Sequence, residues 1–251
     1  MRNYNLKGIY VATVLAGAIL LPASIHAQLP QPDSSETVWD GVFSEDQATR
    51  GKASYDSSCS SCHRPDLGAF EGALKGQTFM DRWREDTLEP LYSNISKSMP
   101  RNNPGSLDKS TYVDIIAYIL QENGFPSGAS DLKSDILKNI QVTAKEGPEP
   151  LPTGALVQAF GCIKEDPINT WVLMNATPAL RTRNPEKSSD TDLKASEAKL
   201  PGTANYRLVD VAFYHPERYK DRMAEAKGFL VADPHDGISV TSLTPLSKAC
   251  P

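Results

Sequence analysis

The stretch SEDQATRGKASYDSSCSSCH, residues 44–63, decides how the first half of this 251-residue chain folds. It opens with S-x-x-Q, where Ser44 stands three residues before Gln47. This is the capping-box spacing of a helix N-terminus. It ends with C-x-x-C-H, whose last residue is His63. The stretch predicts a helix from Ser44 to about Tyr55 that delivers two thiols and an imidazole at its end.

The C-x-x-C-H motif of Cys59, Cys62 and His63 has the spacing of covalent c-type haem attachment. Thiols one helical turn apart can add to the two vinyl groups of a porphyrin, and the following histidine becomes the proximal iron ligand. The alternatives are a redox dithiol, which normally follows a strand, and half of a zinc site. Cys162 and Cys250 lack the spacing of a second zinc pair. We therefore expect one covalently bound haem c.

The second axial ligand is predicted to be Met99, which Pro100 follows in the irregular segment 96–106. A loop there can cross the far side of the haem and present a soft thioether. Met80 lies in a helical pattern, where core packing is the expected role. The other candidates lie in the second half of the chain, where they read as packing, surface or turn residues: Met174, Met223, His215 and His235.

The proximal histidine needs a hydrogen-bond acceptor for its second ring nitrogen, and the pocket needs apolar walls. The ring N–H of His63 is expected to bond a backbone carbonyl in the loop 64–68, which would fix the ring. The candidates for the haem wall, each of which could equally be ordinary core, are Leu67, Phe79, Trp83, Leu91, Ile95 and Leu107.

Further helices are expected over 79–85, 88–97 and 107–122, the last with Ser106 as its N-cap and Asn123-Gly124 as its stop. The apolar residues of the following segment repeat at helical spacing and are predicted to pack back on this domain: Leu132, Ile136, Leu137 and Ile140.

A Pro-rich linker at 145–152 separates this helical part from a second domain, 153–251, with a different periodicity. Short strands are predicted at 155–163, 170–175, 206–211, 226–232 and 238–243. The polar stretch 177–205 reads as a long loop. The expected fold is an all-α domain followed by a small antiparallel β barrel or sandwich.

Residues 1–27 read as a secretory signal peptide, with cleavage after Ala27 and a spacer at 28–37. An uncleaved membrane anchor is the alternative. Export would place the chain in an oxidising compartment, bacterial periplasm or exterior. There, Cys162 and Cys250 most simply form a disulfide, and a reactive dithiol is the alternative.

The composition limits the class of function. The 31 acidic residues outnumber the 26 basic ones, and the formal net charge is −5. This balance argues against nucleic acid and anionic membranes as partners. We find no nucleophile–base arrangement, Gly-rich phosphate loop or metalloprotease spacing, so an enzyme is not expected.

Residues 38–128 resemble a class I mono-haem cytochrome c domain, within a predicted domain of 38–144. Gly51 and Tyr55 resemble the family's first helix, Tyr118 its last helix, whose aromatic packs on that glycine, and Met99-Pro100 its distal-ligand motif. The resemblance implies helices around one haem, iron held by His63 and Met99, and electron transfer. The domain is also similar to cytochrome modules associated with secreted bacterial dehydrogenases.

The second domain is similar to small secreted β-domains of OB-like character, a resemblance that implies no activity. Trp171 and Tyr206 could line a binding face, although a packing role fits them better.

The leading hypothesis is an electron carrier that takes single electrons from a dehydrogenase toward a terminal oxidase or another cytochrome. The cytochrome subunit of an oxidoreductase complex is a variant of this role. A haem-based gas or redox sensor, with displaceable Met99, is one alternative. A binding module whose β-domain recognises a glycan or partner protein is another.

Overall fold

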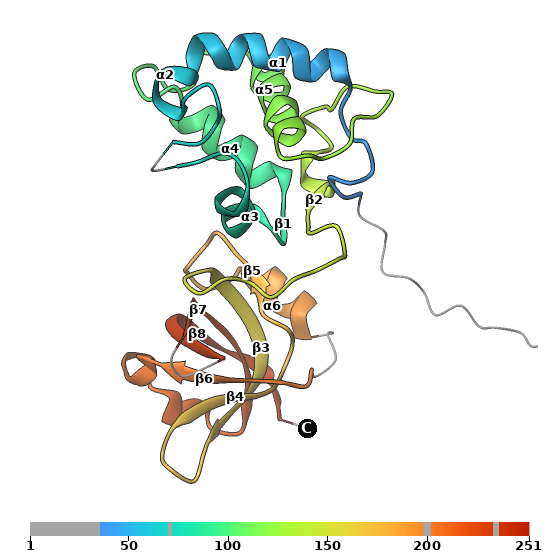
Figure 1. The fold of residues 1–251 in the computed structure, drawn as a ribbon. Helices are drawn as coiled ribbons and strands as arrows, with labels where there is room; N and C mark the ends of the chain where they lie inside the picture. Colours follow the sequence, from blue (N-terminus) through green and yellow to red (C-terminus); the bar gives the residue numbers. More distant parts are fainter. Residues whose placement is uncertain (1–35, 70–71, 198–201, 233–235, 251) are drawn as a thin grey trace, which may run out of the picture. The chain divides into compact units, whose positions relative to one another are not determined.

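The computed structural model describes residues 36–69, 72–197, 202–232 and 236–250. Helices dominate the first part and strands the second, which confirms the predicted fold class (Figure 1). We call residues 36–142 the helical region and residues 155–250 the barrel region. The predicted signal peptide lies outside the described residues. The helices of the helical region are α1 (Glu45–Ser58), α2 (Ser60–His63), α3 (Gln77–Trp83), α4 (Leu88–Ser98), α5 (Lys109–Glu122) and the 3-10 turn η1 (Leu137–Asn139).

Helix α1 begins where the capping pattern predicts. The hydroxyl of Ser44 accepts a hydrogen bond from the backbone N–H of Gln47 at 3.1 Å. The reciprocal half of the capping box is not formed, because the Gln47 amide instead bonds both backbone groups of Leu132 and the carboxylate of Asp114. The buried Gln47 side chain thus ties the start of α1 to α5 and to the segment after it.

Helices α1 and α5 cross in close contact at Gly51. A Cβ atom on Gly51 would lie 1.9 Å from the backbone oxygen of Asp114 and 3.0 Å from Cβ of Tyr118. One helical turn further along α1, the rings of Tyr55 and Tyr118 pack with centroids 5.3 Å apart. The predicted contact between the last helix's aromatic and this glycine is therefore present, and it requires a residue without a side chain.

Helix α5 begins two residues later than predicted. Its N-cap is Asp108, with extended backbone, and its first helical residue is Lys109. Ser106 is exposed in the preceding loop and does not cap the helix. Asn123 and Gly124 end the helix as expected, and Gly124 has a positive φ of 82°.

The helical region has its own apolar core, to which every helix except the short α2 contributes buried side chains. The segment after α5 packs back on this core, as predicted, through Leu132, Leu137 and Ile140. It ends in β2 (Gln141–Val142), which pairs antiparallel with β1 (Asp86–Thr87). This short ladder was not predicted, since two-residue strands have no periodicity to detect.

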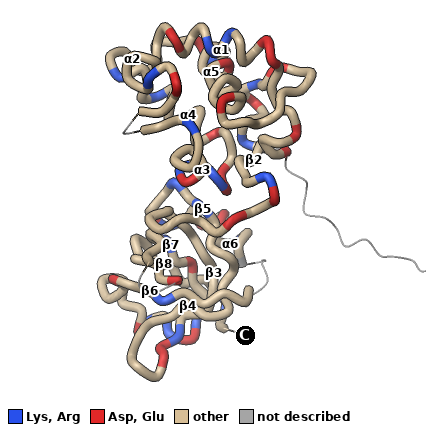
Figure 2. The backbone as a smooth tube through the Cα atoms, viewed as in Figure 1, with Lys and Arg blue, Asp and Glu red and all other residues tan. Residues whose placement is uncertain are grey.

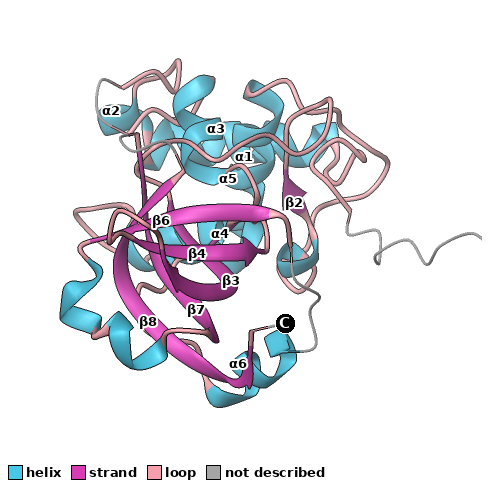
Figure 3. Ribbon diagram, turned by 90° about the horizontal axis from the view of Figure 1, so that it is seen from below, coloured by secondary structure: helices cyan, strands magenta, loops and turns pink. Residues whose placement is uncertain are grey.

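The strands of the barrel region are β3 (Leu156–Glu165), β4 (Trp171–Ala176), β5 (Leu180–Arg181), β6 (Ala204–Val209), β7 (Arg222–Val231) and β8 (Gly237–Ala249). All but β5 correspond to the five predicted strands, and β3, β7 and β8 are longer than predicted. Strand β3 pairs with β7 along its first part and with β4 along its end, so β3, β4, β6, β8 and β7 form a closed ring (Figure 3). The barrel is not fully antiparallel as expected, because β6 and β8 run parallel. The OB-like resemblance stays a prediction.

The stretch 177–205, predicted as a loop, contains β5 and the helix α6 (Asp190–Glu197). The Ser189 hydroxyl accepts from the N–H of Asp192, a local cap that the sequence pattern could have revealed. Leu193 of α6 is buried against Phe160 and Leu246. The packing of this single apolar side chain therefore anchors a helix whose other residues are mostly polar. Two 3-10 turns, η2 (Val211–Tyr214) and η3 (Pro216–Tyr219), connect β6 to β7.

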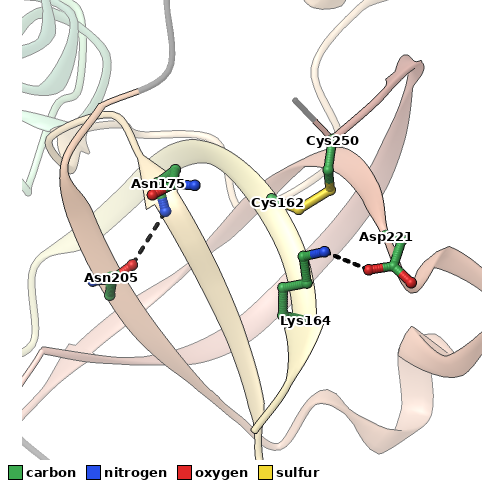
Figure 4. Close-up of a disulfide and its surroundings, with 6 residues drawn as sticks. All are labelled: Cys162, Lys164, Asn175, Asn205, Asp221 and Cys250. Atoms are coloured by element: carbon green, nitrogen blue, oxygen red, sulfur yellow. Dashed lines mark hydrogen bonds and ion pairs between the residues drawn. A yellow bond between two sulfur atoms is a disulfide. The ribbon is translucent and has the colours of Figure 1, made fainter.

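The predicted disulfide joins Cys162 of β3 to Cys250, with Cα atoms 5.5 Å apart (Figure 4). Beside it, Lys164 and Asp221 form an ion pair at 2.5 Å. Tyr206 and Trp171 both belong to the barrel core rather than to an open face. Tyr206 is 9% exposed, and its hydroxyl accepts from the N–H of Ala179.

Candidate functional site

The C-x-x-C-H motif lies where α1 gives way to α2. Cys59 is the C-cap of α1, and its N–H bonds the carbonyl of Tyr55 at 2.8 Å. The N–H groups of Cys62 and His63 both bond the carbonyl of Cys59, at 3.1 and 2.9 Å. This tight turn places Cys59, Cys62 and His63 within about one helical turn of one another, as their spacing predicts.

The imidazole of His63 is fixed through its Nδ1 atom, which lies 3.1 Å from the backbone oxygen of Gly72. The acceptor was expected in the loop 64–68, so that part of the prediction was wrong. The carbonyl of Arg64 is already used, since it accepts from the hydroxyl of Tyr55 at 2.7 Å and from the N–H of Leu67. Burial raises the pKa of Tyr55, which keeps this hydroxyl protonated as a donor.

Gly72 reaches the ring because its loop folds back. The N–H of Leu74 bonds the carbonyl of Leu67 at 2.9 Å, which closes the loop. Gly72 itself has a φ of 79°, and a Cβ atom there would lie 3.6 Å from Cε1 of His63. With Nδ1 donating to this carbonyl, Nε2 carries the free lone pair that an iron ligand needs.

The two thiols have different surroundings. Cys62 is exposed, and Cys59 is partly buried. Burial, followed by the neighbouring Cys62, raises the pKa of Cys59 to about 11. Catalytic dithiols depend on a thiolate of lowered pKa. The protonated Cys59 at a helix end therefore argues against the redox-dithiol alternative and is compatible with thioether formation.

Met99 is placed by a separate element. It is the C-cap of α4, with its N–H on the carbonyl of Ile95 at 3.0 Å and its side chain partly buried. The backbone oxygen of Met99 accepts a hydrogen bond from the hydroxyl of Tyr112 at 2.7 Å. Met80 packs against the helical core, which agrees with the role expected for it.

The remaining candidates belong to the barrel region. Met174 is 40% exposed on β4, and Met223 packs beside Phe160, Leu193 and Leu246. His215 is exposed and pairs with Glu217. His235 lies outside the described residues.

The proposed haem wall is apolar and buried. Five of its residues are buried in the helical core: Leu67, Phe79, Trp83, Leu91 and Ile95. The sixth, Leu107, is partly exposed and packs against that core. Their packing is what the sequence predicts, and their contact with a haem stays a prediction.

The donor set fits haem c. Two free thiols at one-turn spacing are followed directly by an imidazole whose Nδ1 is engaged, and no hydrogen bond of its Nε2 is recorded among the described residues. The thioether of Met99 belongs to the C-cap residue of α4. Within the described ranges no cluster of three or more His, Cys, Asp or Glu side chains could hold a metal ion. No helix in these ranges is long and apolar enough to cross a bilayer.

A helical fold that carries this motif is similar to that of c-type cytochrome domains. Residues 46–119 match the family model of cytochrome c oxidase, cbb3-type, subunit III. The matched range contains most of α1 and of α5, together with Cys59, Cys62, His63 and Met99. Neither a curated protein nor a solved structure matched the chain. The barrel region therefore has no counterpart among these comparisons.

Three parts of this site were not found from the sequence. They are the carbonyl of Gly72, the Tyr55 hydroxyl that occupies the carbonyl of Arg64, and the Tyr112 hydroxyl on Met99. Each is a contact between segments whose spacing encodes no pairing. Of the three, only Gly72 could have been suspected from the sequence, because an isolated glycine often marks a close backbone approach or a positive φ.

Proposed function

We propose that the chain is an exported, periplasmic or secreted, mono-haem c-type cytochrome that transfers single electrons from a dehydrogenase toward the respiratory chain. The observation that supports it most is the orientation of His63. Its Nδ1 is held by the Gly72 carbonyl directly after the two thiols. This contact leaves the lone pair of Nε2 available for a metal ion, next to two free cysteines. A role in packing alone would not explain this combination.

In this proposal haem c supplies a one-electron couple at its iron. Cys59 and Cys62 would anchor it through thioether bonds, and His63 and Met99 would be the iron ligands. The buried residues of the helical core exclude water. A thioether ligand and a dry pocket both favour the less charged ferrous state, so they raise the reduction potential.

The proposed partners are proteins rather than nucleic acid or membrane. Acidic and basic residues are interspersed along the chain, and the net charge is −5 (Figure 2). Electron-transfer partners bind through small, transient surfaces, so no large apolar patch is needed. Export by a signal peptide cleaved after Ala27 is part of the proposal. N-terminal sequencing of the protein recovered from periplasm should begin at Gln28, and an intact Met1 would overturn cleavage.

The deciding experiment is the absorption spectrum of the haem-loaded protein, oxidised and reduced, with CO then added to the reduced form. We expect a low-spin spectrum, a far-red sulfur-to-iron band in the ferric state, and no change on adding CO. A pyridine haemochrome assay should give one haem per chain with both vinyl groups saturated.

A prompt Soret shift on adding CO would overturn the electron-carrier proposal in favour of a sensor, because it requires an open or displaceable distal position. Loss of the haem on acid–acetone extraction would overturn covalent attachment. A ferric spectrum without the sulfur-to-iron band would remove Met99 from the ligand set.

A further inference from the structure

The loop that carries Met99 has little packing of its own. Residues 101–106 are all exposed. The local hydrogen bonds are one from the N–H of Asn103 to the oxygen of Pro100, at 2.9 Å, and one from Gly105 to the oxygen of Met99, at 3.3 Å. A segment with so few buried contacts opens easily unless something else fixes it.

Tyr112, in the first turn of α5, supplies that fixing contact. It is 3% exposed, and its hydroxyl donates to the backbone oxygen of Met99 at 2.7 Å. The oxygen of the Tyr112 hydroxyl also accepts a longer bond, 3.4 Å, from the N–H of Leu107. The hydroxyl thus bridges the two ends of the loop, and both of its bonds go to the loop.

The contact acts on the backbone from which the Met99 side chain departs. Met99 has extended geometry, with φ −127° and ψ 153°. Fixing its carbonyl oxygen restricts ψ and so the direction in which Cβ and the thioether project. Without the hydroxyl, that oxygen would keep only the 3.3 Å bond from Gly105.

We propose that Tyr112 is a positioning residue for the Met99 thioether. Its hydroxyl bonds both ends of the loop, which restricts the position of Met99. The thioether is thereby held as an iron ligand, and external ligands are kept from replacing it. The inference rests on the proposed function, specifically on Met99 as the second iron ligand. It adds a residue of α5 that touches neither the thiols nor His63 in any recorded contact.

The test compares Tyr112→Phe with Tyr118→Phe in the full-length, haem-loaded protein. Tyr118 lies on the same helix and is equally buried, and no hydrogen bond of its hydroxyl is recorded among the described residues. Tyr112→Phe should weaken the ferric sulfur-to-iron band, lower the midpoint potential and raise the rate of CO binding to the ferrous form by about tenfold. Tyr118→Phe should leave all three as in the wild type.

A second measurement needs no variant. Amide hydrogen exchange of Gly105 and Leu107 in the wild-type protein should be slow, although the neighbouring loop residues are exposed. Exchange of both at the rate of an unstructured chain would overturn the inference.

The outcomes distinguish a failure of the positioning role of Tyr112 from a failure of Met99 as an iron ligand. If the wild-type protein itself lacks the sulfur-to-iron band, the Met99 ligation fails. If the wild type has the band and Tyr112→Phe keeps band, potential and CO rate unchanged, the role of Tyr112 fails. If both tyrosine variants change alike, the effect comes from helix packing, and the positioning role is also overturned.

Discussion

The helical region and the barrel region each contain one pair of cysteines, and only the pair in the barrel region is joined by a disulfide. Cys59 and Cys62 are one turn apart and remain free thiols at a surface-accessible helix end. Cys162 and Cys250 are 88 residues apart and form a disulfide. The comparison teaches that two cysteines close in sequence need not pair, whereas two that are far apart pair where the fold brings them together.

The largest expected effect is the loss of haem attachment in the double variant Cys59→Ser, Cys62→Ser. Without thiols no thioether can form, so the protein should show no haem stain on a denaturing gel. The matched control is Cys162→Ser, Cys250→Ser, which should keep its haem stain. Covalent haem in the first variant, or none in the second, would contradict the division of roles between the two pairs.

The next effect concerns the disulfide. Removing a cross-link that closes 88 residues should cost the barrel region about 4.5 kcal/mol of unfolding free energy in the chain-entropy model, an upper figure. Amide hydrogen exchange, followed separately on barrel and helical peptides, measures it. We expect faster exchange in the barrel strands of Cys162→Ser, Cys250→Ser and unchanged protection of α1 and α5. Equal loss in both regions would show that they unfold as one unit.

The helix crossing should give a smaller loss in the other region. Gly51→Ala places a Cβ atom against the backbone oxygen of Asp114, which cannot rotate away. We expect about 2–3 kcal/mol of destabilisation in the helical region, measured by urea unfolding. Ala53→Leu, which adds a larger side chain on the exposed face of α1, is the control and should change stability little. A Gly51→Ala protein as stable as the wild type would show that the helices can separate freely.

The smallest expected effect is a pH dependence of stability that arises from one carboxylate. Hydrogen bonding from Ser44, followed by that from Arg50, lowers the pKa of Asp131 below its ordinary value of 3.8. Such a carboxylate stabilises the fold above pH 3.8, and the contribution is lost as pH falls through the folded-state pKa. Asp131→Asn should destabilise the helical region at pH 7 by under about 1 kcal/mol, because the pair is exposed.

The difference between Asp131→Asn and the wild type should shrink as the pH is lowered from 7 to 3, in thermal unfolding followed by circular dichroism. Asp135→Asn removes an exposed carboxylate for which no ion pair is recorded among the described residues, and it is the control. A difference that grows on acidification would contradict the sign of the shift.

The helix starts and the strands were predictable to different degrees. Ser44 and Gln47 mark the start of α1 because a cap is a local pattern. The start of α5 was misplaced, since Ser106 and Asp108 are both good capping types and the local sequence does not choose between them. The strands were found from their periodicity. The parallel pairing of β6 with β8 was not found, because the sequence of one strand does not specify the direction or register of its partner.

The candidate site divides in the same way. Local spacing alone predicted Cys59, Cys62 and His63 as a haem-attachment motif, since residues within one helical turn lie close together. Only the tertiary structure decided that Gly72 fixes the imidazole and that Tyr112 closes the loop of Met99. Those bonds join residues 9 and 13 positions apart across a loop. Their geometry depends on how the loop folds back, which no repeat or spacing in the sequence records.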